Sequence, residues 1–357
     1  MNKYEIAVVP GDGIGNEVIP ASIKVLDVLA VTFGFQLAYK HYDYSCKNFA
    51  KEGKMMPDDG LERLRDCDSI FLGAVGYPGV PDHISLWGLL IPIRRAFDQY
   101  INLRPVRLLK GVDSPLKNIG NVDYMIVREN SEGEYSNIGG RFNEGTENEM
   151  VKQESIFTKK GVDRVMKYAF ELAQKRNNKI TSATKSNGII HTMTYWDERF
   201  KEIGTAYPNV EKNQFHIDIL CAHFVQHPEW FDVVVASNLF GDILSDLGPA
   251  VVGGIGIAAG GNINPEKIFP SMFEPVHGSA PDIAGKNIAN PIACFWTGAM
   301  MLEHLGELEA AKLLMDAIET LTFSRKVLTR DLGGTATTTE VTNELINIIK
   351  NNSFIKF

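Results

Sequence analysis

The chain has 357 residues, of which 44% are hydrophobic and 22% are charged, and its formal net charge is -8. Its length suggests about two domains with ample apolar material for a core. The acidic balance argues against nucleic-acid binding, which needs a basic surface. The 4 cysteines show no Cys-x-x-Cys spacing, which argues against zinc and disulfide frameworks. Because no apolar stretch near the N-terminus is long enough for a signal peptide or a membrane span, we expect a soluble, cytoplasmic protein without a membrane partner.

The first part of the chain alternates between strand and helix patterns. Apolar runs that end at turns predict buried strands at 4–9, 35–42 and 69–75. Residues 18–29 and 59–67 have the spacing of helices that bury one face. A repeated strand–helix–strand order predicts parallel strands covered by helices, and therefore an α/β protein.

The second part continues the alternation after one irregular stretch. Residues 133–157 are polar and rich in glycine, and they are expected to form either a loose loop or a β-arm that reaches a second subunit. The clearest later patterns are strands at 124–128, 180–184 and 231–237 and helices at 159–175, 191–200 and 216–225.

The stretch VVPGDGIGNE (8–17) places three glycines between the first strand and the first helix. A dinucleotide fingerprint would need its third glycine one residue after Gly15, where Asn16 stands. No Gly-Lys-Ser/Thr follows, so a phosphate-binding P-loop is also excluded. Taken alone, the stretch is best interpreted as a tight turn whose glycines allow positive φ, with Asn16 as a helix cap.

Asp242 and Asp246 follow the strongest late strand and lie four residues apart, on one face of the predicted helix. Two such carboxylates are hard oxygen ligands, which favour binding of Mg²⁺ or Mn²⁺ over zinc. The alternative is that both merely complement the helix dipole, which explains Asp242 better than Asp246. Asp218, in HIDIL, is a candidate third ligand.

Several basic residues suggest an acidic small-molecule substrate. Arg94, Arg104 and Arg128 end or begin predicted elements, and arginine forks bind carboxylates at two points. Taken alone, each arginine is better interpreted as a solvated surface residue, and only their convergence suggests a di- or tricarboxylate. Lys185, after an apolar strand, could be a buried base with a lowered pKa, and Tyr135 could donate a proton.

The chain resembles the β-decarboxylating dehydrogenases, a family that includes isopropylmalate, isocitrate, tartrate and D-malate dehydrogenases. The resemblance covers nearly the whole chain, and the last two segments that carry it are long and specific. The segments are PGDGIGNEV at 10–18, NLRP at 102–105, VREN-SEGEY at 127–135, ATKSN at 183–187, NLFGDILSDLG at 238–248 and EPVHGSAPDIAGKNIANP at 274–291.

The resemblance implies a two-domain, isopropylmalate-dehydrogenase-like α/β fold that is not a Rossmann fold. Residues 1–103 plus 256–357 would form the large, cofactor-binding domain, and residues 104–255 the central domain. The central domain would contain a dimer arm at about 133–157 and the metal-binding aspartates. The active site would lie in the cleft between the domains of a homodimer, whose subunits complete each other's sites.

The resemblance also assigns roles to individual residues. Lys185 and Asp218 would each reach the site of the partner subunit. The matched positions are Tyr135 and Lys185 for catalysis; Arg94, Arg104, Arg128 and Leu90 for the substrate; Asp218, Asp242 and Asp246 for the metal; and Ile14, Val75, Glu274, His277, Gly278, Ser279, Ala280, Asp282, Ile283 and Asn290 for the cofactor.

The implied cofactors are NAD and Mg²⁺ or Mn²⁺, with K⁺ as a further candidate. Members that use NADP carry a basic residue and a tyrosine where Asp282 and Ile283 stand. A carboxylate accepts hydrogen bonds from a ribose 2′-hydroxyl and repels a 2′-phosphate, so NAD is expected.

The segment before Arg94 indicates the substrate. Gly88 and Leu90 replace the polar residues with which isocitrate dehydrogenases meet a third carboxylate, which disfavours isocitrate. Trp87 replaces the acidic residue usual in isopropylmalate dehydrogenases. The stretch SLWGLLIPIRRAFDQYINLRP at 85–105 resembles the tartrate and D-malate dehydrogenases most, and this resemblance implies NAD-dependent oxidative decarboxylation of D-malate to pyruvate, with possible activity on tartrate. The alternatives are 3-isopropylmalate dehydrogenase and a non-catalytic regulatory subunit.

Overall fold

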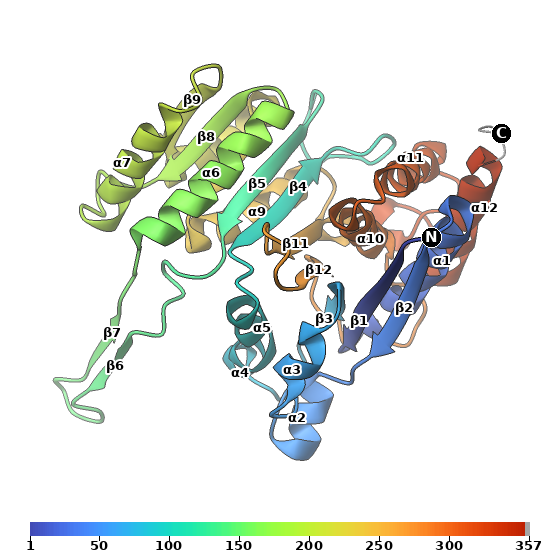
Figure 1. The fold of residues 1–357 in the computed structure, drawn as a ribbon, viewed down its shortest axis with the longest axis horizontal. Coiled ribbons are helices and arrows are strands. Elements are labelled where there is room, and N and C mark those ends of the chain that lie inside the picture. The colour runs from blue at the N-terminus through green and yellow to red at the C-terminus, as the bar shows by residue number, and fades with distance from the viewer. Residues whose placement is uncertain (354–357) are drawn as a thin grey trace. The chain divides into compact units, whose positions relative to one another are not determined.

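The computed structural model describes residues 1–353, which fold as two compact units (Figure 1). Unit 1 contains residues 1–99, 107–117 and those from 249 onward. Unit 2 contains residues 100–106 and 118–248. Unit 1 is therefore built from stretches far apart in the sequence.

Five strands of unit 1 lie side by side in the order β2-β1-β3-β12-β11. β1 runs parallel to both β2 and β3, and β12 runs parallel to β3. The parallel arrangement expected for the first three strands is confirmed. β11 is antiparallel to β12, so the sheet is mixed. The bounds are β1 Lys3–Gly11, β2 Gln36–His41, β3 Ser69–Ala74, β11 Ala259–Ile263 and β12 Ser271–Pro275.

The helices of unit 1 cover both faces of these strands. The long helices α1, α10, α11 and α12 pack on one another, and α1 and α10 also contact β3. Figure 1 shows these long helices together, apart from the short helices α2 to α5. The bounds are α1 Gly15–Phe33, α2 Cys46–Glu52, α3 Gly60–Arg65, α4 Asp82–Ser85, α5 Ile91–Ala96, α10 Ile292–Leu305, α11 Leu308–Ser324 and α12 Thr338–Ser353, with short 3-10 turns at Ile255–Ile257 and Arg330–Leu332.

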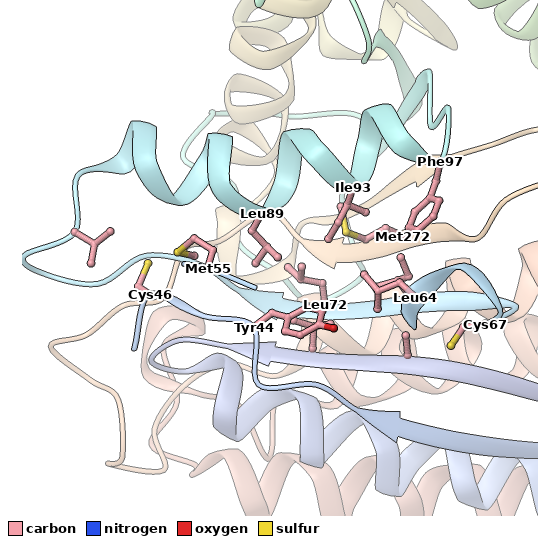
Figure 2. Close-up of a cluster of buried hydrophobic side chains, with 14 residues drawn as sticks. Tyr44, Cys46, Met55, Leu64, Cys67, Leu72, Leu89, Ile93, Phe97 and Met272 are labelled. Atoms are coloured by element: carbon pink, nitrogen blue, oxygen red, sulfur yellow. The ribbon is translucent and has the colours of Figure 1, made fainter. Parts of the chain in front are cut away.

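A cluster of buried side chains joins the short helices to the strands (Figure 2). A π-helical turn, Leu86–Leu90, connects α4 to α5, and Leu89 and Ile93 point from this segment onto the strands. Both side chains are 0% exposed. Because residues four apart share a helix face, burying Leu89 and Ile93 leaves Leu90 and Arg94 together on the neighbouring face. The core thus decides where the two predicted substrate residues point.

Five strands of unit 2 lie in the order β4-β5-β10-β8-β9. β10 is parallel to β5 and β8, and β8 is parallel to β9. The sequence did not indicate β9, because EKNQFH is a polar edge strand without an apolar run. The bounds are β4 Ile101–Arg107, β5 Asp123–Glu129, β8 Lys179–Thr184, β9 Glu211–His216 and β10 Val233–Ala236.

The helices of unit 2 follow the predicted pattern closely. α6 spans Lys159–Lys175, as predicted, and begins where the Thr158 hydroxyl accepts a hydrogen bond from the Gly161 amide at 3.0 Å. It packs on β5, β8 and β10. The others are α7 Thr192–Gly204, α8 Ile217–Gln226, the 3-10 turn Pro228–Trp230, and α9 Asn238–Val251, which belongs to unit 2 as far as Gly248.

The glycine-rich stretch at 133–157 forms a hairpin rather than a loose loop. Strands β6 (Gly139–Phe142) and β7 (Met150–Gln153) pair antiparallel to each other. Figure 1 shows the hairpin extending away from the body of unit 2. All of its strand residues are exposed, among them Phe142, Met150 and Val151.

Candidate active site

The glycine turn brings backbone close to backbone. Gly11 and Gly13 have φ of 71° and 53°, values that favour glycine. A Cβ on Gly13 would lie 2.0 Å from the carbonyl oxygen of Ser279, so a larger residue cannot fit there. The expectation that Asn16 caps the helix is wrong, because α1 already begins at Gly15 and no side chain caps it. The side-chain amide of Asn16 instead donates to the backbone carbonyl oxygens of Gly11 and Gly13.

Asp12 has a role that the sequence did not indicate. Its carboxylate is 3% exposed and accepts hydrogen bonds from the amides of Cys46 at 3.0 Å, Lys47 at 3.2 Å and Gly76 at 3.2 Å. These amides belong to the start of α2 and to the residues after β3. Asp12 therefore fixes two other chain segments, the start of α2 and the residues after β3, beside the glycine turn.

The residues predicted to bind the cofactor lie around one edge of unit 1. The Ile14 amide donates to the Ser279 carbonyl at 2.8 Å, which joins the glycine turn to the predicted adenosine loop. Ile14, Glu274, His277, Ser279 and Asn290 are buried, Val75, Ala280 and Ile283 are half-buried, and Gly278 and Asp282 are exposed.

Two side chains of this group have defined electrostatic surroundings. Burial lowers the pKa of His277 below its usual range, partly offset by backbone hydrogen bonds, and its Nδ1 lies 3.0 Å from the Gly278 carbonyl. The Asn290 amide donates to Asp331 at 2.8 Å. His277 is therefore biased towards the neutral form, and Asn290 is held in one orientation.

Arg94, on α5, is buried beside Glu274. Its Nη2 donates to Oε1 of Glu274 at 3.0 Å, and Asn262 donates to the same oxygen at 2.8 Å. This pairing connects a predicted substrate residue directly to a predicted cofactor residue. The sequence indicated both residues but not their contact.

Arg128, Tyr135 and Asp242 meet in unit 2. Arg128, near the end of β5, donates to Asp242, and its guanidinium lies 5.5 Å from the centre of the Tyr135 ring. The Tyr135 hydroxyl donates to Oδ2 of Asp242 at 2.8 Å. Arg104, on β4, donates from Nε to Asn102 at 2.7 Å. The structure thus brings together a predicted substrate residue, a predicted catalytic residue and a predicted metal ligand.

Asp246 lies one turn after Asp242 on α9, as the spacing predicted. Although the residue keeps contact with solvent, partial burial of its carboxyl group raises its pKa, and the nearby charge of Asp242 adds to the effect. The charges of Arg104 and Arg128 oppose this shift. A cation between the two carboxylates would relieve their repulsion.

Lys185 and Asp218 form a separate pair in unit 2. The Lys185 ammonium donates to Asp218 at 2.8 Å, and this hydrogen bond holds the pKa of Asp218 below its usual range. Lys185 is half-buried rather than fully buried, because 30% of its side chain is exposed. The ammonium lies at the end of β8, where it is accessible and paired with a carboxylate.

The residues present fit a divalent cation only in part. Asp242 and Asp246 offer hard oxygen ligands from adjacent turns of α9. Within residues 1–353 no three histidine, cysteine, aspartate or glutamate side chains gather closely enough to hold a metal ion. One copy of the chain therefore supplies a pair of carboxylates rather than a complete site.

The sequence also did not reveal the residues that position Arg128. Oδ1 of Asn238 accepts from Nε and Nη2 of Arg128 at 3.1 and 2.7 Å. The Glu134 carboxylate accepts from the Ser237 hydroxyl at 2.8 Å and from the Leu239 amide at 3.1 Å, at the start of α9. Only the position of Asn238 at the junction of a strand and a helix could have suggested such a role.

Comparison with known proteins places this arrangement in a family. The chain belongs to the isocitrate/isopropylmalate dehydrogenase family, which it matches over residues 5–348. The fold is that of a solved isocitrate dehydrogenase from Methylococcus capsulatus, with a TM-score of 0.88 and 33% identity over 98% of this chain and 100% of that one.

Two curated relatives are more similar in sequence. The chain is 57% identical to D-malate dehydrogenase [decarboxylating] of Escherichia coli K12, over 98% of this chain and 99% of that protein. It is 56% identical to tartrate dehydrogenase/decarboxylase of Pseudomonas putida, over 95% of this chain and 96% of that protein.

Among the described residues, no helix has the length and apolar character needed to cross a membrane.

Proposed function

We propose that this protein is a decarboxylating dehydrogenase of the D-malate/tartrate type, which converts D-malate and NAD to pyruvate, CO₂ and NADH. The observation that carries this proposal is identity above 55% to both a D-malate and a tartrate dehydrogenase, over nearly the full length of each. The predicted catalytic, substrate and metal residues are all present, which argues against a non-catalytic subunit.

The arginines and Leu90 define a pocket chemistry suited to a small 2-hydroxydiacid. Arg94, Arg104 and Arg128 would bind the two carboxylates, because guanidinium forks pair with carboxylates at two points. Leu90 shares a helix face with Arg94 and offers no hydrogen bond to a third carboxylate.

Two residues would handle protons. Lys185 would take the proton of the C2 hydroxyl as the hydride leaves C2, and Tyr135 would protonate the enolate left by loss of CO₂. When bound, the divalent cation would supply Lewis-acid polarisation of the C2 oxygen. Tyr135 is already positioned by its hydrogen bond to Asp242.

The metal site would be completed by a second copy of the chain. Asp242 and Asp246 of one subunit would bind Mg²⁺ or Mn²⁺ together with an Asp218 donated by the other subunit. Lys185 would accompany Asp218 of its own chain into the site of the other subunit. The pairing of Lys185 with Asp218 supports this, because the two would enter the neighbouring site together. We propose a homodimer whose β6–β7 hairpin contacts the partner.

Initial rates followed at 340 nm would test the function. NAD, Mn²⁺ and K⁺ would be supplied with D-malate, L-malate, the tartrates, 3-isopropylmalate or isocitrate. We expect D-malate to have the highest kcat/KM, with measurable turnover of tartrate. No NADH from any substrate would overturn the enzyme assignment. A higher kcat/KM for 3-isopropylmalate would overturn only the choice of substrate.

A further inference from the structure

The first turn of α1 contacts a loop that unit 1 holds in an unusual conformation. We call residues 277–290, between β12 and α10, the cofactor loop. Ala280, Gly285 and Asn287 in this loop have φ of 40°, 78° and 55°, in the left-handed region. Left-handed backbone is unfavourable for alanine in particular, and such conformations persist only where surrounding contacts enforce them.

One end of the cofactor loop is held by the glycine turn. The Ile14 amide donates to the Ser279 carbonyl at 2.8 Å, next to Ala280. The close approach of Gly13 to the same carbonyl leaves no room for a side chain. This contact fixes the part of the loop that precedes Asp282.

The other end is held by Glu17. Its Oε1 accepts from the Gly285 amide at 2.6 Å, and its Oε2 accepts from the Asn287 amide at 2.8 Å. Both amides belong to residues in the left-handed region, and hydrogen bonds to a carboxylate are stronger than those between neutral groups. Glu17 is half-buried, so water competes only in part.

Helix α12 also holds this end of the loop. The Thr338 amide donates to the Asn287 carbonyl at 3.0 Å, and the Thr339 amide and hydroxyl donate to Oδ1 of Asn287 at 3.2 and 3.0 Å. These contacts anchor Asn287 but leave the Gly285 amide to Glu17. Glu17 is therefore the side chain that holds the turn just after Ile283.

We propose that Glu17 is a positioning residue for the dinucleotide, which keeps the cofactor loop in its binding conformation without touching the cofactor. This inference rests on the proposed function, because it takes His277–Asn290 as the NAD-binding segment. Without Glu17 the loop would sample other conformations, and NAD would have to order it on binding. That cost would appear as weaker binding of NAD rather than as slower chemistry.

Two measurements on the full-length protein test the proposal. Hydrogen exchange in the absence of cofactor would measure the exchange rates of the Gly285 and Asn287 backbone amides in the wild type, Glu17→Gln and Glu17→Ala. NADH binding, followed by fluorescence, would give Kd for the same proteins. Glu62→Gln is the matched control, because the Glu62 side chain is exposed and has no hydrogen bond or ion pair to any of residues 1–353.

We expect faster exchange at both amides and a rise in Kd of about tenfold for Glu17→Ala, with a smaller rise for Glu17→Gln, which keeps one acceptor oxygen. The KM for NAD should rise while kcat at saturating NAD stays unchanged. Unchanged exchange, or faster exchange with unchanged Kd, would overturn the role of Glu17. If the wild type itself binds no NADH, the proposed function fails instead, and the exchange result still reports whether Glu17 holds the loop.

Discussion

Asn238 shows how one side chain can connect the predicted catalytic groups of unit 2. It accepts two hydrogen bonds from Arg128, and its own amide donates to the Glu132 carbonyl at 3.2 Å and weakly to Glu129. Glu129 is 0% exposed, and burial raises its pKa, although hydrogen bonds from Ser131 and Glu132 oppose the shift. Asn238 thus separates a buried carboxyl group from the guanidinium that would bind the substrate.

Replacing Asn238 should therefore disturb substrate binding. Asn238→Ala removes the acceptor that orients Arg128, and we expect the KM for D-malate to rise about tenfold, as for the loss of a hydrogen bond to a charged group. Steady-state kinetics would measure this, with Asn347→Ala on the exposed face of α12 as the control. An unchanged KM would show that the other contacts of Arg128, such as the one with Asp242, orient it without Asn238.

Cofactor choice also belongs to the scale of residues. Asp282 is exposed and adjoins the half-buried Ile283 in the cofactor loop. The double substitution Asp282→Lys with Ile283→Tyr should shift preference towards NADP, because the lysine attracts the 2′-phosphate that the carboxylate repels. The ratio of kcat/KM for NAD and NADP measures the shift. The prediction fails if that ratio does not change.

At the scale of elements, the segment from α4 to α5 owes its orientation to its buried face. Leu89 and Ile93 pack in the cluster shown in Figure 2, and the π-helical turn before α5 sets which side chains share the neighbouring face. Such turns are often found at functional sites. The packing of this segment therefore controls the direction of Leu90 and Arg94.

Leu89→Ala should lower the free energy of unfolding by about 2–4 kcal/mol, because it removes buried contacts and leaves a cavity. Urea denaturation measures this change, and Leu308→Ala at a 60% exposed site should change it by less than about 0.5 kcal/mol. A similar small effect for Leu89→Ala would mean that the segment is not anchored by this cluster.

At the scale of the whole molecule, buried titratable groups should make stability depend on pH. Burial, with a smaller contribution from Lys267, lowers the pKa of His304 to about 4. An unfolded histidine has a pKa near 6.5. Between these values the unfolded chain binds a proton that the folded protein does not, so stability present above about pH 6.5 is lost as the pH falls towards 4.

His304→Gln should weaken this pH dependence. The variant cannot gain the proton on unfolding, so its free energy of unfolding should fall less than that of the wild type between pH 7 and pH 4, by on the order of 2 kcal/mol. Urea denaturation at several pH values tests this. Parallel pH profiles for the two proteins would show that His304 titrates normally in the folded state.

The sequence by itself determined the alternation of strands and helices and the chemical groups available for function. These features follow from local periodicity, as at α6, and from motifs such as NLFGDILSDLG. The spacing in that motif alone places Asp242 and Asp246 one turn apart on the same helix face. The family resemblance added roles for those groups. An edge strand such as β9 escaped prediction because its pairing partner, not its polar sequence, makes it a strand.

Only the tertiary structure decided which distant groups meet. The contacts of Glu17 with Gly285, Arg94 with Glu274 and Arg128 with Asn238 join residues more than 100 positions apart. Unit 1 likewise assembles from three separate stretches of chain. Periodicity reports the surroundings of one segment, whereas such contacts depend on how whole elements pack. The glycine turn is the clearest case: its sequence predicts a turn, but its contact with the Ser279 carbonyl exists only because the sheet of unit 1 brings both loops to one edge.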